Sequence, residues 1–166
     1  MDKRIIHMLL ATTLVALGST AAAQSPGANP AQDERVAAAR VMVQEGRDEI
    51  IAEEMGLSAP EAGKFWPVYE TYRSDMNVIR DRYATTLGRY LAAYDEGEIS
   101  DEFARELLDE WLKFTQDSHK VRKDYVKKFE KVLPLRKVVR FYQLEDKMDA
   151  EIDAELAVVI PLMEAF

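Results

Sequence analysis

The stretch from Asp101 to Val132 constrains the fold most, because it contains neither Gly nor Pro. Apolar or small residues recur in it at steps of three and four, the spacing of one face of an α-helix. This stripe consists of Ala104, Leu107, Trp111, Phe114, Ser118, Val121, Tyr125, Phe129 and Val132. The sequence therefore predicts a long amphipathic helix whose stripe packs against the rest of the protein.

Three other segments have the same spacing, so we expect four long helices. The first runs from Asp33 to Met55, the second from a Ser58 cap to Tyr94, and the fourth from Pro134 to Pro161. The alternating pattern of β-strands is missing from the sequence. Short connections between long helices favour neighbours that run in opposite directions. The sequence predicts an all-α fold of four long helices in antiparallel hairpins, and an elongated one, because such helices exceed a compact globule of this length.

Each helix has a stripe that we expect to be buried. In the first helix it is Val36, Ala39, Val43, Ile50 and Ile51. In the second it is Phe65, Tyr69, Tyr72, Met76, Ile79, Tyr83, Leu87, Tyr90 and Tyr94. In the fourth it is Leu135, Val138, Phe141, Leu144 or Glu145, Met148, Ile152 and Leu156. Pro67 is expected to kink or loosen the start of the second helix, because its ring removes a backbone hydrogen bond.

The helix ends also have recognisable signals. Gly56 suits the end of the first helix. Ser58 can cap the second helix, and Glu61 stands where it would complete a capping box. Gly97 is the expected pivot of the next turn, after which Ser100 caps the third helix.

The N-terminus has the pattern of an export signal. A short positive region is followed by an apolar run and then by Ala21, Ala22 and Ala23. A membrane span would need ~20 apolar residues, and neither this run nor any later one suffices. We expect a signal peptide over 1–23, cleaved after Ala23, a flexible linker over 24–32 and a single all-α domain over 33–166. The pattern therefore predicts an exported protein.

Charge and composition argue against several classes of function. Without the signal peptide, 20 basic and 29 acidic residues leave a net charge of −9, which disfavours nucleic-acid binding. The absence of Cys excludes disulfides, thiol catalysis and Cys-ligated zinc. His119 has Gln116 three residues before it, where a di-iron bundle would have Glu. There is no Gly-rich phosphate loop and no G-x-S-x-G motif, so we expect no enzyme, no cofactor and no metal site.

The charges of the third helix are strongly polarised. Residues 95–110 have a net charge of −7, and residues 120–140 a net charge of +7. Two copies laid antiparallel would bring Glu102, Glu106 and Glu110 of one against Lys123, Lys127 and Lys131 of the other. The sequence therefore suggests an antiparallel homodimer along this helix. Solvated faces screened by salt are the alternative.

Several short motifs resemble the periplasmic LTxxQ family, which includes the Spy and CpxP stress proteins. The resemblance rests on the helix start Leu57-Ser58-Ala59-Pro60-Glu61 and on Phe65-Trp66-Pro67-Val68-Tyr69-Glu70-Thr71-Tyr72-Arg73, with looser echoes at residues 99–103 and 133–137. Ser58 replaces the Thr of the motif and Glu61 the Gln, so this chain resembles a divergent member. The resemblance implies a thin, curved, all-α antiparallel dimer in the periplasm.

The same resemblance implies a function. Members of that family are ATP-independent chaperones for partly unfolded proteins or envelope-stress proteins that dock on a sensor kinase, and some relatives bind metal. We therefore expect a chaperone of this kind. The alternatives are a regulatory or scaffold protein with one specific envelope partner, or a metal-responsive relative. The residues expected to bind the client or partner are Lys120, Lys123, Lys127, Lys131, Arg136 and Arg140.

Overall fold

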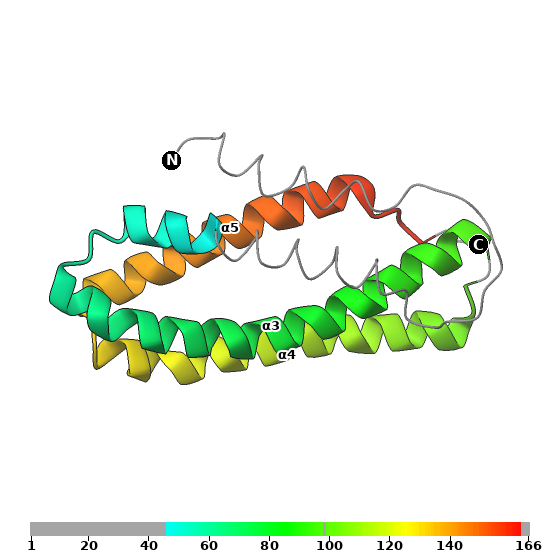
Figure 1. Cartoon of the computed structure of the whole chain (residues 1–166). Coiled ribbons are helices and arrows are strands. Elements are labelled where there is room, and N and C mark those ends of the chain that lie inside the picture. The colour runs from blue at the N-terminus through cyan, green and yellow to red at the C-terminus, as the bar shows by residue number, and fades with distance from the viewer. Residues whose placement is uncertain (1–45, 98, 164–166) are drawn as a thin grey trace, which may run out of the picture. The chain divides into compact units, whose positions relative to one another are not determined.

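The computed structural model describes residues 46–97 and 99–163, and all regular structure in these ranges is helical. A helix over 46–54 is followed by α3 (Ala59–Glu96), α4 (Asp101–Glu130) and α5 (Leu135–Val159) (Figure 1). The all-α prediction is therefore confirmed. The predicted signal peptide, the linker and the part of the first helix over 33–45 lie outside the described residues.

The described residues form two compact units. One contains residues 46–56 and 141–156, and the other contains residues 57–97, 99–140 and 157–163. The first has a small apolar core: Ile50, Ile51, Met55, Phe141, Leu144 and Met148. Arg47 is buried in this unit, where its guanidinium group pairs with the carboxylates of Glu145, at 3.2 Å, and Asp149. The predicted burial of Ile50 and Ile51 is thus confirmed, and Leu144 and Glu145 are both buried.

The helix ends in the second unit follow the predicted chemistry. The Glu61 carboxylate accepts hydrogen bonds from the Ser58 backbone N–H and from the Ser58 hydroxyl, both at 2.8 Å. The Ser100 hydroxyl accepts from the backbone N–H of Phe103 at 3.1 Å. Gly97 ends α3 with a φ of 71°, a left-handed conformation that favours glycine. These residues determine where α3 ends and α4 begins. Pro67, which was expected to kink or loosen this helix, lies inside α3, and the helix continues through it.

Helices α3 and α4 form an antiparallel hairpin with two different halves. The half around Tyr72 is aromatic, and its ring pairs are Phe65–Phe129, Tyr72–Phe129 and Tyr72–Tyr125 at centroid distances of 5.7, 5.8 and 5.4 Å. Phe65, Tyr72 and Phe129 are fully buried. Aromatic pairs of this kind add to the free energy gained from burying their surface. This half therefore holds the hairpin by apolar packing.

The half nearer Gly97 is held by ion pairs. The Arg82 guanidinium group donates to the carboxylates of Glu110 and, at 2.9 Å, Asp117. Arg89 binds Glu106 through two hydrogen bonds, one of them 2.9 Å long. Tyr83 also stacks on Phe114 in this half, with the ring centroids 4.5 Å apart. The hairpin interface is thus partly charged in this half.

Two predicted core residues are exposed instead. Trp111 was expected in the α4 stripe, and Leu135 in the fourth helix, but their exposed fractions are 51% and 63%. In α4 the face toward α3 passes through Glu110 at this level, because Glu110 pairs with Arg82. Trp111 lies one residue further around the helix and is left outside. In α5 Val138 is 2% exposed and takes the buried position of the first turn, whereas Leu135, the first residue of the helix, is exposed.

Candidate partner-binding surface

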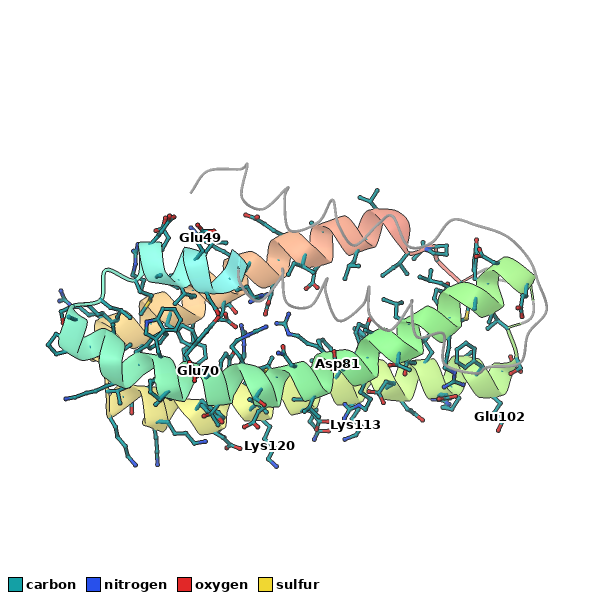
Figure 2. All side chains as sticks on the ribbon, viewed as in Figure 1. Glu49, Glu70, Asp81, Glu102, Lys113 and Lys120 are labelled. Atoms are coloured by element: carbon teal, nitrogen blue, oxygen red, sulfur yellow. The ribbon has the colours of Figure 1, made fainter. Side chains whose placement is uncertain are left out.

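The six predicted binding residues all lie in one compact unit and all are exposed. Lys120, Lys123 and Lys127 lie on the outer side of α4, and Lys131 is its C-cap. Figure 2 shows Lys120 extending away from α3. Arg136 and Arg140 are one turn apart on α5, so they share a face of that helix. We call these six residues the cationic surface.

Other bases in the same part of the chain are engaged in contacts within the protein. Lys128 Nζ lies over the Tyr125 ring, 3.6 Å from its centroid, in a cation–π contact. Lys137 Nζ donates to the Glu61 carboxylate at 2.6 Å. This bond and those from Ser58 lower the pKa of Glu61 to about 2. Lys128 and Lys137 are therefore engaged in contacts that stabilise the fold.

Tyr125 is the structural support beneath this surface. Its side chain is buried, and its hydroxyl donates to the Asp75 carboxylate at 2.7 Å. Burial, together with the bond to Asp75, raises the pKa of Tyr125 to about 12. The phenol therefore remains protonated and keeps this bond at neutral pH. It joins α3 to the part of α4 that carries the lysines.

Two exposed apolar residues stand beside the cations. Leu135 and Val139 have exposed fractions of 63% and 49%, and their spacing places them on one face of α5. They are near neighbours of Arg136 and Arg140 along the same helix. Ammonium and guanidinium groups bind carboxylates, whereas Leu and Val bind apolar side chains. The surface can therefore bind a segment that is both acidic and apolar.

The acidic beginning of α4 is different in character. Glu106 and Glu110 of the predicted dimer ladder are paired with Arg89 and Arg82 of α3. The hydrogen bond from Arg89 lowers the pKa of Glu106. Glu102 is exposed near the start of α4 (Figure 2). Two of the three predicted acidic contacts, Glu106 and Glu110, are therefore used within the hairpin.

Neither a metal centre nor a membrane helix emerges from the described residues. Over 46–97 and 99–163, no three His, Asp or Glu side chains gather in a way that could hold a metal ion. His119, the candidate that the sequence analysis set aside, is exposed on α4. Within the same ranges, no helix combines the length and the apolar character needed to cross a bilayer.

Comparisons of the chain with models of known protein families, with curated proteins and with solved structures gave no match. Function is therefore inferred from the surface itself.

The apolar part of the site was not predicted from the sequence. Leu135 was assigned to the core because it fits a step of three to Val138. The sequence does contain a pattern that indicates it. Leu135, Val139 and the half-buried Tyr142 are spaced four and three residues apart, and they form a second apolar stripe beside the stripe of buried residues. Two overlapping apolar stripes on one helix indicate that one of them faces something other than the core.

Proposed function

We propose that this chain is a non-enzymatic periplasmic protein that binds partly unfolded proteins without ATP. It acts as a holdase: it covers exposed segments of a client and so prevents them from aggregating. The observation that carries the proposal is the exposed pair Leu135 and Val139 next to Arg136 and Arg140 on α5, together with the exposed lysines near the end of α4. The export pattern at the N-terminus and the family resemblance support the same proposal.

The cations and the apolar residues of this surface contribute to binding in different ways. Exposed cations attract acidic segments over a Debye length of about 10 Å and accelerate encounter, although each exposed contact adds little affinity. Leu135 and Val139 then gain free energy by removing apolar surface of the client from water. Because neither interaction requires a defined client sequence, the surface suits many partly unfolded chains.

The test is suppression of the aggregation of a chemically denatured model protein at stoichiometric amounts without ATP. Light scattering should fall with the wild-type protein at low salt, and less so at about 500 mM salt, where charges are screened. The variant Leu135→Ser/Val139→Ser should lose most of the effect. Its matched control is Val78→Ser, because Val78 is also an exposed apolar residue, 68% exposed, but lies on α3.

The charge contribution has its own variant and control. Lys127→Glu/Arg136→Glu reverses two members of the cationic surface, whereas Lys147→Glu reverses an exposed base in the later part of α5. We expect only the first to reduce suppression. Wild-type protein that fails with several unrelated clients at low salt would refute the chaperone function. Capture of one stoichiometric envelope protein in that case would favour the regulatory or scaffold alternative.

A further inference from the structure

One end of the α3–α4 hairpin carries an exposed apolar residue with bases beside it. Where α4 passes into α5, four residues are exposed: Lys131, Pro134, Leu135 and Arg136. Leu135 extends furthest into solvent among the apolar residues of this turn, with an exposed fraction of 63%. Leu133 is 4% exposed, so it anchors the same turn in the core. We call the four exposed residues the tip.

The tip is held in place by contacts with the start of α3, which lies at the same end of the hairpin (Figure 1). Lys137 Nζ, next to the tip, donates to the Glu61 carboxylate at 2.6 Å. Within the turn, the backbone N–H of Leu133 donates to the Phe129 carbonyl at 2.9 Å, and that of Lys137 to the Pro134 carbonyl at 2.8 Å. A surface that is ordered before it binds loses little conformational entropy on binding.

The charges of the hairpin are separated along its length. Residues 57–76 and 120–140, which form the half with the tip, contain eleven bases and five acids, a net charge of +6. Residues 77–119, which form the other half, contain five bases and ten acids, a net charge of −5. Lys131 of the tip and the exposed Glu102 are about 44 Å apart along α4. A negatively charged plane would therefore attract the tip, while the acidic end stays beyond a Debye length of about 10 Å.

The chemistry of the tip matches the layers of a lipid surface. In a bilayer that contains anionic lipids, negative headgroups lie outside an apolar layer. Long basic side chains such as those of Lys131 and Arg136 can stay among the headgroups while Leu135 reaches the apolar boundary. Guanidinium groups also bind phosphate through paired hydrogen bonds. Each base close to such a surface strengthens binding about fivefold.

We propose that the tip docks on the surface of a bilayer that contains anionic phospholipids, with the acidic half of the hairpin directed away from it. The contact is peripheral and reversible, because one Leu and a few bases bury far less apolar surface than a spanning helix. This function goes beyond the proposed chaperone function, which requires no membrane. Lys131, Leu135 and Arg136 belong to both surfaces, so a bilayer and a client compete for them.

Vesicle flotation of the exported form, from Gln24 onward and without client, tests the docking. Omitting residues 1–23 keeps the apolar run of the signal peptide from binding lipid by itself. Vesicles of phosphatidylcholine and phosphatidylglycerol at about 3:1 should bind the protein at about 10 mM salt and release most of it at about 500 mM salt. Vesicles of phosphatidylcholine alone should bind about tenfold less.

Two results of this experiment would overturn the proposal. One is the absence of flotation with the anionic vesicles at low salt, or equal flotation with the neutral ones. The other is displacement from the vesicles by glycerol phosphate at about 1 mM, because a free phosphate group would then occupy a small site and no bilayer surface would be needed.

Charge reversal tests the position of the contact. Lys131→Glu/Arg136→Glu reverses two bases of the tip, whereas Arg105→Glu/Lys147→Glu makes the same change in net charge at exposed positions outside it. The first variant should bind anionic vesicles at least about tenfold more weakly, and the second within about twofold of wild type. Circular dichroism checks that both keep the wild-type helix content. Equal weakening would show that only net charge matters, and would overturn docking through the tip.

The apolar contribution has its own variant. Leu135→Ser should bind anionic vesicles severalfold more weakly than wild type, because less apolar surface leaves water. Its control is Val78→Ser, since Val78 is 68% exposed on α3. Equal binding of the two variants would overturn the contact of Leu135 with the apolar layer.

A dye that is sensitive to polarity reports the orientation. The chain has no Cys, so Leu135→Cys and Glu102→Cys each introduce a single thiol for labelling. Anionic vesicles should shift the emission of the dye at position 135 to the blue and leave the dye at position 102 unchanged. A blue shift at both positions, or at neither, would overturn docking by the tip. These measurements involve no client, so their failure would leave the chaperone function to its own aggregation test.

Discussion

Replacing Phe129 by Ala should lower the free energy of unfolding far more than replacing Trp111 by Ala, although both residues belong to the stripe predicted for the third helix. Phe129 is fully buried and lies within 6.2 Å of three rings, those of Phe65, Tyr72 and Tyr125. Trp111 is 51% exposed and faces away from α3. The periodicity of the sequence predicts that both residues are buried, whereas the structure buries only Phe129. The two variants therefore test which of these is right.

The expected magnitudes differ by severalfold. Truncation of a buried Phe to Ala costs about 3–5 kcal/mol, because apolar burial is lost and a cavity remains. The loss of three ring contacts places Phe129 toward the upper part of that range. For Trp111→Ala we expect about 1 kcal/mol or less, since surface substitutions are usually small and Ala is the better helix former.

Urea denaturation followed by circular dichroism measures both changes. Phe129→Leu is the control for side-chain volume and should cost less than Phe129→Ala. Equal losses for Phe129→Ala and Trp111→Ala would refute the register, because both side chains would then be buried to the same extent.

Three further predictions concern polar contacts. The folded-state pKa of Glu61 is about 2, below its ordinary value of 4.5, so the stability it contributes is complete above 4.5 and is lost as the pH falls toward 2. The melting temperatures of wild type and Glu61→Gln should therefore converge over that interval, and a constant difference would show that Lys137 does not bind the carboxylate. Tyr125→Phe should remove a phenol that titrates at about 12 in ultraviolet absorbance and lower stability by about 1 kcal/mol through the lost bond to Asp75, and an unchanged titration curve would contradict this. Ser100→Ala should cost about 1 kcal/mol in urea denaturation, with Ser100→Gly closer to wild type; equal stability of all three would exclude a capping role.

Much of the fold could be predicted because it depends on local chemistry. Helix starts at Ser58 and Ser100 and the stop at Gly97 are set by side-chain and backbone geometry within a few residues. The helical spacing of the apolar residues correctly predicted the burial of Phe65, Phe129 and most other core residues. The exposure of the candidate surface could also be predicted, since lysines four residues apart on a helix lie on the same side of it.

The pairing of charges between α3 and α4 could not be predicted from the sequence. Glu106 and Glu110 look like free acids in a polarised helix, yet they bind Arg89 and Arg82. Those partners lie far away in the sequence, and many arginines and lysines would have fitted equally well. Which of them meet depends on the rotation of one helix against the other.

The sequence by itself determined that this protein is helical, which residues cap its helices and which bases lie near the end of α4. These properties follow from backbone hydrogen bonding and from spacing along one chain. Only the tertiary structure decided which side of α4 faces α3. Its register was set jointly by aromatic packing around Phe129 and by the ion pairs of Arg82. Because those pairs occupy the interface, Trp111 is left on the outer side of α4.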